Sequence, residues 1–339
     1  MRDIKNYTLE ELRQLLIKEG FPAYSASQIF NWVYKKRIED FSSMTDLSKK
    51  LRAYLNETFF FSQITPVKKE TSSCGVSKIL YRLKDDSLIE TAVIPDEERY
   101  TLCLSTQVGC KFRCNFCVSG TTGFRRNLSV SEIINQYLIT EKILKIKITN
   151  IVYMGIGEPL DNFENVVKSI KIFTHPSGIY LGKRKICIST VGIPEKIKKL
   201  ADLKLGVKLS LSLHSADEEK RKKLIPLAKR YSLKKIMEAV KYFSKKEKFP
   251  ITFEYILIKD FNMSEEDVYK LSILLKGIKK YKINLIPYNP SRFFLWQVPS
   301  QEEIENFKNT LKKYNLFFTL RRPRGRNIEA ACGQLKANF

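Results

Sequence analysis

Three cysteines stand close together in the segment Cys110-Lys-Phe-Arg-Cys114-Asn-Phe-Cys117. This C-x3-C-x2-C spacing offers three thiolates, the usual protein ligands of iron–sulfur clusters. The pattern predicts that Cys110, Cys114 and Cys117 bind a [4Fe-4S] cluster and leave its fourth iron without a protein ligand. A structural zinc site or three reduced buried thiols are the alternatives, although zinc would favour a fourth Cys or His close by.

An iron with an open position can chelate the amino and carboxylate groups of S-adenosylmethionine (SAM). Electron transfer to the sulfonium then releases a 5′-deoxyadenosyl radical. We therefore expect a [4Fe-4S] cluster and SAM as cofactors. Cys103 and Cys332, taken alone, favour buried structural roles, and so does Cys187; Cys74 lies in a Ser-rich loop and is given no role.

Strands and helices alternate from residue 100 onward, which predicts a parallel sheet with helices outside it. Six or seven such units favour an α/β fold with a partial or full barrel, and we expect a partial (β/α)6 barrel. The predicted strands span 101–105, 149–155, 185–190, 207–214, 251–258, 283–289 and 317–322. The predicted helices include 130–144, 162–173, 233–244, 265–276 and 301–313.

Polar residues interrupt the apolar runs where several of these strands end. Chemistry in β/α barrels takes place at the carboxyl ends of the strands. Ordinary strand-to-loop polarity explains any one group, but explains all four together less readily. The four groups are Gly157-Glu158, Ser189-Thr190, Ser212-Leu213-His214 and Asn289.

The chain before the barrel predicts a small helical domain followed by a β-hairpin. Thr8 and Glu11 form a capping-box pattern ahead of a helix that Gly20 closes, and further helices are expected at 25–36 and 45–55. A hairpin is expected over 77–95 with its turn at 85–87. We therefore divide the chain into a helical domain (1–75), a hairpin extension (76–99), a barrel (100–322) and a C-terminal segment (323–339).

The formal net charge of +24 favours a polyanionic partner, because each Lys or Arg bound to a phosphate releases counterions. Lysine drift in an A+T-rich genome is the alternative. Basic residues near the cysteine loop and Cys332 predict a phosphate-lined mouth, unless they are solvated charge runs. They are Arg125, Arg126, Arg321, Arg322, Arg324 and Arg326.

No apolar run of roughly 18 residues predicts a membrane-spanning helix. The polar N-terminus is not typical of a signal peptide. We therefore expect a cytoplasmic protein with no membrane partner.

Five segments resemble the RlmN/Cfr family of radical-SAM RNA adenine methyltransferases. They are ETAVIPDEERYTLCLSTQVGCKFRCNFC, MGIGEPL, SLSLH, LIPYNP and AACGQL. The resemblance runs from about residue 80 to 335 and looks closer to the adenine-C2 (RlmN) branch. The N-terminal helical domain resembles the accessory domain of the family only in being helical. A C8-methylating Cfr-type enzyme is one alternative. A non-catalytic RNA-binding protein with a structural zinc or iron–sulfur site is another.

The resemblance implies methylation of C2 of adenine 2503 in 23S rRNA and of adenine 37 in tRNAs. It implies that Cys332 takes a methyl group from one SAM and that a radical from a second SAM activates this methyl group. Glu90 is implied as the proton acceptor, and Cys103 as the thiol that releases RNA by a transient disulfide with Cys332. An electron donor such as flavodoxin or ferredoxin is also implied.

The resemblance also implies which residues contact SAM, and it places Met154 near the methylated cysteine. The implied SAM contacts are Gly157, Glu158, Ser189, Ser212, Leu213, His214 and Asn289.

Overall fold

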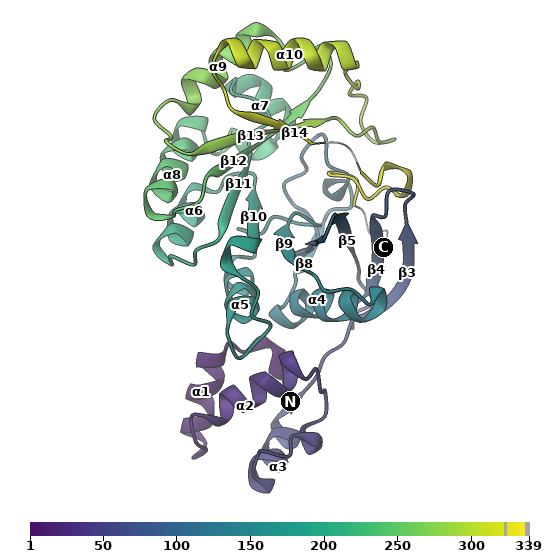
Figure 1. Ribbon diagram of the computed structural model, residues 1–339, viewed down its shortest axis with the longest axis vertical. Coiled ribbons are helices and arrows are strands. Elements are labelled where there is room, and N and C mark those ends of the chain that lie inside the picture. The colour runs from purple at the N-terminus through teal and green to yellow at the C-terminus, as the bar shows by residue number, and fades with distance from the viewer. Residues whose placement is uncertain (322–323, 336–339) are drawn as a thin grey trace.

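A curved ten-stranded sheet runs through the computed structural model, which describes residues 1–321 and 324–335 (Figure 1). Neighbouring strands from β6 to β14 are parallel, and β3, β4, β5 and β6 pair antiparallel. The strand order is β14-β13-β12-β11-β10-β9-β6-β5-β4-β3. The parallel strands are β6 (Arg99–Cys103), β9 (Asn150–Tyr153), β10 (Ile186–Thr190), β11 (Lys208–Ser212), β12 (Ile251–Leu257), β13 (Tyr281–Pro287) and β14 (Phe318–Leu320).

Helices lie outside the parallel part of the sheet, as alternation of strand and helix requires (Figure 1). Because β14 and β3 stand at opposite ends of the described sheet, the barrel is partial, and the predicted α/β fold class is confirmed. The helices are α4 (Val130–Leu144), α5 (Phe163–Thr174), α6 (Pro194–Asp202), α7 (Glu218–Leu224), α8 (Leu233–Lys246), α9 (Glu265–Leu275) and α10 (Gln301–Lys313). Helices α6 and α7 were not predicted from the sequence.

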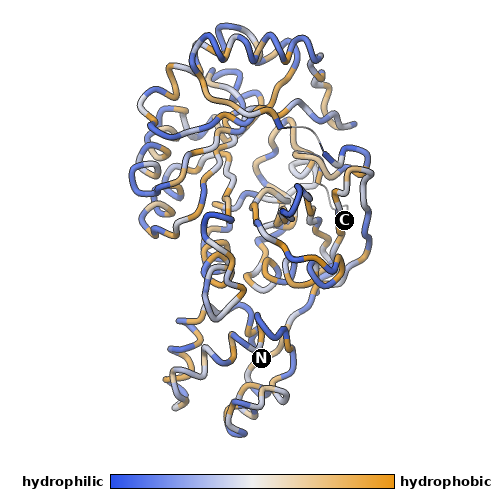
Figure 2. The backbone as a smooth tube through the Cα atoms, in the orientation of Figure 1, coloured by the Kyte–Doolittle hydropathy of each residue, from blue (hydrophilic) through white to orange (hydrophobic). Residues whose placement is uncertain are grey.

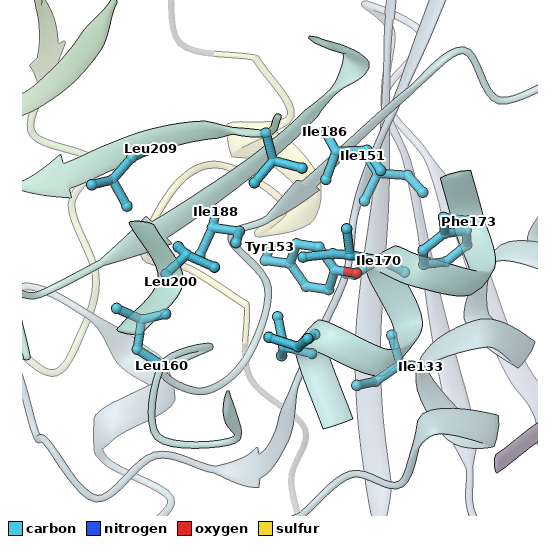
Figure 3. Close-up of a cluster of buried hydrophobic side chains, with 14 of the residues drawn as sticks. Ile133, Ile151, Tyr153, Leu160, Ile170, Phe173, Ile186, Ile188, Leu200 and Leu209 are labelled. Carbon is cyan, nitrogen blue, oxygen red and sulfur yellow. The ribbon is translucent and has the colours of Figure 1, made fainter. Parts of the chain in front are cut away.

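The core lies between the sheet and its helices, where apolar side chains of both meet (Figure 3). Figure 2 shows the same division along the backbone, with apolar strands inside and hydrophilic stretches on the outer helices. Tyr153 of β9 is fully buried, and its hydroxyl shares a 2.7 Å hydrogen bond with Ser169 of α5. Among the side chains of this core are Ile133, Ile151, Ile170, Phe173, Ile186, Ile188, Leu200 and Leu209.

The N-terminal residues form the predicted helices. α1 (Leu9–Lys18) begins at the Thr8–Glu11 capping box, and α2 (Ser25–Phe30) continues as a π-helix to Lys35. The predicted start of the third helix is wrong by four residues. α3 (Lys49–Thr58) begins after Ser48 because the Ser48 side chain accepts the Leu51 N–H and caps the helix there.

Two ribbons adjoin the barrel. The predicted hairpin is confirmed as β4 (Ser77–Arg82) and β5 (Leu88–Asp96), but β3 (Thr65–Thr71) adds a strand that was not predicted. Its residues are mostly exposed and polar, so they carry no apolar period. A short pair, β7 (Gln107–Gly109) with β8 (Phe124–Asn127), was also not predicted, and β1 (Arg2–Asp3) pairs with β2 (Phe59–Phe60).

Candidate active site

The cysteine loop is closed at its base by the β7–β8 ribbon. The Cys110 N–H donates to the Gly123 carbonyl at 2.8 Å, so residues 110–123 form one closed loop. Gly109 has φ +73°, and a Cβ atom there would lie 1.8 Å from the Gly123 oxygen. Only glycine therefore fits at the point where the two strands meet.

The far side of the loop rests on α7. The backbone N–H of Asn115 donates to the Leu224 carbonyl at 2.8 Å, and its side-chain amide donates to the Lys223 carbonyl at 2.6 Å. The Trp296 indole donates to the Asn115 carbonyl at 2.5 Å. These contacts fix the position of Asn115, between Cys114 and Cys117.

The three cysteines line one cavity of about 160 Å³ at the carboxyl ends of the strands. The polar residues at the strand ends predict chemistry at this end of the sheet. The cavity is also lined by Met154, Gly157, Glu158, Ser189, Ser212, His214, Glu254, Arg321 and Cys332. The cluster cysteines and most of the residues expected at the SAM site therefore line the same cavity as Cys332, which lies near the C-terminus.

Gly157 and Glu158 follow β9 and pack closely against β7. Gly157 has φ +100°, and a Cβ atom there would lie 2.5 Å from Gln107 Cβ, so a side chain would separate the two segments. The buried Glu158 carboxylate accepts the N–H groups of Leu160 at 3.0 Å and Val191 at 2.9 Å. Burial nevertheless raises the pKa of Glu158 to about 7, because it penalises the charged form more than these bonds favour it.

His214 follows β11 and is neutral at ordinary pH. Burial lowers the pKa of His214 to about 3. Its Nδ1 accepts the Ile256 N–H at 3.1 Å, so the ring proton lies on Nε2. The Phe116 ring, just ahead of Cys117, meets the imidazole edge-on with centroids 4.6 Å apart. The cysteine loop therefore packs directly against the end of β11.

The C-terminal segment is strapped to the cysteine loop, which brings Cys332 to the cavity. The Val118 N–H donates to the Gly333 carbonyl at 2.7 Å, and the Ser119 hydroxyl donates to the Leu335 carbonyl at 2.7 Å. On its other side this segment packs on β4 and β5, where Ala330 and Leu335 join the cluster around Ala92 (Figure 1).

Cys103, at the end of β6, lies beside Cys332. Both line a smaller cavity of about 40 Å³ together with Met154 and Arg321. Burial raises the pKa of Cys103 to about 12, and the nearby Arg321 opposes this rise. The sulfur of Cys332 is the main cause that raises the pKa of Arg321, so a permanent cation lies next to both thiols.

Three predicted site residues lie elsewhere. Leu213 is fully buried in the core and does not line the 160 Å³ cavity. Asn289 lines an adjoining cavity of about 570 Å³, where its amide donates to the Cys332 carbonyl at 3.2 Å. Glu90 is buried and lines a separate cavity of about 500 Å³, in which its carboxylate lies 3.2 Å from Lys78 Nζ. The structure thus does not bring Glu90 into one cavity with Cys332.

The predicted phosphate-binding arginines are mostly engaged with the protein. The Arg126 guanidinium contacts the carboxylates of Asp85 and Glu132 at 2.8–2.9 Å, so its charge is already paired within the protein, and its contact with phosphate stays a prediction. Arg326 donates to the Asn289 side chain at 2.7 Å, and Arg324 donates to the Pro95 carbonyl. Arg321 lies inside the cavity, and Arg322 lies outside the described residues.

The donor chemistry of the loop fits an iron–sulfur cluster. The loop offers the cavity three thiol donors, and within residues 1–321 and 324–335 no three potential ligands are grouped to hold a single metal ion. Burial raises the pKa of Cys110 to about 12 and raises the pKa values of Cys114 and Cys117. Without a metal these groups are thiols, and metal binding would release their protons. Chemically they suit a thiophilic group such as a cluster.

Two family models match this chain. One is described as the radical SAM superfamily and matches residues 104–272, and the other as the ribosomal RNA large subunit methyltransferase N-terminal domain and matches residues 2–60. "Probable dual-specificity RNA methyltransferase RlmN" of Fervidobacterium nodosum is 43% identical over 100% of this chain and 98% of its own length. The Thermotoga maritima protein of the same name is 44% identical over 99% and 98%. The chain belongs to the RlmN family.

A solved structure supports the same conclusion for the fold. A radical SAM methyltransferase from Sphaerobacter thermophilus matches with a TM-score of 0.91 and 36% identity over 100% of both chains. Membership of the RlmN family makes this chain a radical-SAM RNA methyltransferase, and the superfamily implies a [4Fe-4S] cluster and SAM. The resemblance stated from the sequence is therefore confirmed. No helix among the described residues is long and apolar enough to cross a membrane.

Two charged residues of this RlmN-family site were not predicted. Glu254 interrupts the apolar run of β12, and a single carboxylate in such a run could have indicated a functional residue. Its side chain accepts hydrogen bonds from Ser210 at 2.7 Å and Asn284 at 2.6 Å. Arg221 stands in the run EEKRKKL, and nothing in that run distinguishes it from solvated neighbours. Arg321 was predicted at a phosphate-lined mouth, whereas it lines the cavity of the cluster cysteines.

Proposed function

We propose that this chain methylates C2 of adenine in RNA and uses Cys332 as the methyl carrier. The observation that supports this most directly is the shared cavity of Cys332 with Cys110, Cys114 and Cys117. A sulfur more than 200 positions further along the chain is held at the cluster site by hydrogen bonds from Val118 and Ser119. The proposed substrates are adenine 2503 of 23S rRNA and adenine 37 of tRNAs.

The chemistry of adenine explains why a carrier is needed. C2 of adenine is not a nucleophile, so it cannot displace a methyl group from SAM. A thiolate can, and Cys332 would form the new S–C bond while the donor leaves as S-adenosylhomocysteine. The guanidinium of Arg321 lies close to the Cys332 sulfur, which is the main cause of the raised pKa of Arg321. When bound, the cluster would supply the electron that splits a second SAM into methionine and the radical that activates the methyl group.

The remaining steps belong to two further residues of this chain. Glu90 would accept the proton that the adenine ring loses, and the Glu90 cavity adjoins the C-terminal segment through Gln334. Cys103 would attack the sulfur of Cys332 and form the disulfide as the S–C bond to the base breaks, and the former methylene carbon would take a proton and leave as the methyl group of the base. The side-by-side lining of one small cavity by Cys103 and Cys332 supports this last step. An external donor such as flavodoxin or ferredoxin would provide the electrons.

The RNA contact is proposed for the helical domain (1–75) and the mouth above Cys332. The net charge of +24 supports a polyanionic partner. The target base has to leave its stack to reach a buried sulfur, as ring chemistry inside a helix is sterically blocked. The larger cavity of about 570 Å³, which opens beside Cys332, provides room for such a base.

The decisive test is mass spectrometry of adenosines from RNA treated with the anaerobically reconstituted enzyme. We expect 2-methyladenosine in RNA and 5′-deoxyadenosine from SAM with the native chain. Cys332→Ala should abolish methylation, whereas Cys74→Ser, which changes an exposed thiol outside the cavities, should not. Methylation that persists in the Cys332→Ala variant, an 8-methyl product, or a zinc ion with four protein ligands in the loop would each contradict the proposal.

A further inference from the structure

Arg221 of α7 is an arginine with no solvent exposure. Burial lowers the pKa of Arg221 to about 10, so the side chain is still a cation at neutral pH. A buried cation is strongly destabilising unless acceptors surround it. The identity of its acceptors therefore indicates its role.

Backbone carbonyls accept the hydrogen bonds of two of the three guanidinium nitrogens of Arg221. Nε donates to the Leu213 carbonyl at 3.2 Å, and Nη2 donates to the carbonyls of Val191 at 2.6 Å and Ser212 at 3.3 Å. These carbonyls follow or end β10 and β11, so the side chain joins two strand ends. Within the described residues no carboxylate accepts a hydrogen bond from it.

The other terminal nitrogen has no acceptor. Arg221 Nη1 is buried and lacks a hydrogen-bond partner among the described residues. Buried polar groups almost always have one, so an orphaned donor on a cation indicates a ligand site.

Cys114 lies in the same buried cluster as Leu224 of α7, and Val191, whose carbonyl accepts from Arg221 Nη2, packs against that cluster. In agreement with this packing, Cys114 raises the pKa of Arg221 against the larger effect of burial. The hydrogen bonds of Asn115 to Lys223 and Leu224 hold the cysteine loop on the same helix, within one turn of Arg221. The acceptor expected there is therefore sulfur.

We propose that Arg221 donates a hydrogen bond from Nη1 to the sulfur of the cluster, at Cys114 or an adjoining sulfide, and so raises its reduction potential. A donor and a positive charge stabilise the additional negative charge of the reduced cluster. The inference rests on the proposed function only in requiring a cluster held by Cys110, Cys114 and Cys117. Arg221 is a positioning and tuning residue, since it does not touch the reacting carbon.

Redox titration of the reconstituted enzyme, followed by electron paramagnetic resonance, tests this. We expect a more negative reduction potential of the cluster in Arg221→Met. The shift should be smaller in Arg221→Lys, because lysine keeps the positive charge but lacks the planar guanidinium with its several N–H donors. Lys220→Met is the matched control, because it removes the same charge from the adjacent position of α7. Lys220 contacts both carboxylate oxygens of Asp267 at 2.8 Å and should leave the potential unchanged. An unchanged potential in Arg221→Met with an intact cluster would overturn the inference.

A second measurement keeps the inference testable if Arg221→Met does not fold. Native enzyme labelled with ¹⁵N-arginine should show a guanidinium nitrogen coupling in the pulsed spectra of the reduced cluster. This coupling should disappear in labelled Arg221→Lys; if it persists there, another arginine is responsible and the inference is wrong. A cluster without any such coupling refutes only the Arg221 contact, whereas a native chain that assembles no cluster refutes the proposed function too.

Discussion

Burial decides the charge of the single residues in the cavity. It raises the pKa of Glu158 to about 7, so the neutral and charged forms are both populated at neutral pH, and it keeps His214 neutral by lowering its pKa to about 3. It also keeps Cys103 a thiol by raising its pKa to about 12. Arg321 is the exception, since the sulfur of Cys332 stabilises its charge. A cationic group placed next to Glu158 would lower the pKa of Glu158 and favour its carboxylate form.

The first prediction concerns the stability of the metal-free chain as a function of pH. The folded pKa of Glu158 lies above its ordinary value of 4.5, so the stability that the neutral form contributes is complete below pH 4.5 and is lost as the pH rises through 7. Above pH 7 the loss approaches about 3 kcal/mol. Glu158→Gln does not ionise, so its free energy of unfolding should fall less between pH 5 and 8.

Urea denaturation at several pH values measures this difference. The absolute stability of Glu158→Gln is not the readout, because a glutamine can accept only one of the two bonds from Leu160 and Val191. Identical pH slopes for the two proteins would show that Glu158 ionises normally.

The second prediction concerns thiol reactivity, which follows the pKa and the exposure of each thiol. Cys74 is exposed, and a hydrogen bond shared with Ser72 lowers its pKa, whereas Cys103 is buried with its pKa raised to about 12. Brief iodoacetamide treatment of the holoenzyme should alkylate Cys74 at least about tenfold faster than Cys103. Peptide mass spectrometry measures both rates, and Cys74→Ser should lose the fast phase; equal rates would contradict the burial of Cys103.

At the scale of single residues, the sequence predicted site residues where a polar residue type is unusual among its apolar neighbours. Polar side chains at the ends of apolar runs predicted Glu158, Ser212 and His214 correctly as neighbours in one cavity. Burial of cations could not be predicted in this way. Arg221 and Arg321 both stand in basic runs, and only the folded chain shows that Arg221 is buried and that Arg321 lines the cavity.

At the scale of elements, the predictable strands were those with an apolar period. The parallel strands and the β4–β5 hairpin have that period, so their positions were predicted within a few residues. The edge strand β3 is polar, and β7 and β8 contain three and four residues. These ribbons are fixed by pairing with partners rather than by their own side chains, and pairing of this kind leaves little local signal.

The β7–β8 ribbon leads to the third prediction, which compares two glycines with almost the same φ. Gly109 has φ +73° and meets the Gly123 carbonyl, while Gly123 has φ +75° and no atom within 4 Å of an added Cβ. Gly123→Ala should cost only the backbone strain of about 1 kcal/mol. Gly109→Ala should cost more and should lower the iron bound per chain on reconstitution, because the base of the cysteine loop must open. Equal iron contents in the two variants would contradict this role of the ribbon.

At the scale of the whole molecule, contacts between distant segments assemble the site. The bond from Ser119 to Leu335 joins positions 216 apart, and Asn289 bonds to Cys332 across 43 positions. Neither contact has a local sequence signal, so the shared cavity was expected only because of the family resemblance. The N-terminal helices are attached in the same way, through Lys5, which lies 1% exposed beneath α4.

Lys5 therefore leads to the last prediction, on how the helical domain is coupled to catalysis. Its ammonium donates to Asn135 of α4 at 2.7 Å, to the Ser62 carbonyl at 3.1 Å and to Glu39 at 2.5 Å. Lys5→Met would leave these acceptors unpaired and should cost about 3 kcal/mol. Hydrogen exchange should then rise in residues 1–60 more than in the barrel.

If the helical domain holds RNA for the barrel, Lys5→Met should lower RNA methylation several-fold and leave the cleavage of SAM to 5′-deoxyadenosine in the absence of RNA nearly unchanged. The described residues that line the cavity expected to hold SAM all belong to the barrel and the C-terminal segment, so loosening the N-terminal helices removes none of these contacts. Lys18→Met, which removes an exposed charge from α1, serves as the control and should leave hydrogen exchange and SAM cleavage as in the native chain. Parallel losses of both activities in Lys5→Met would instead show that the helices support the barrel itself.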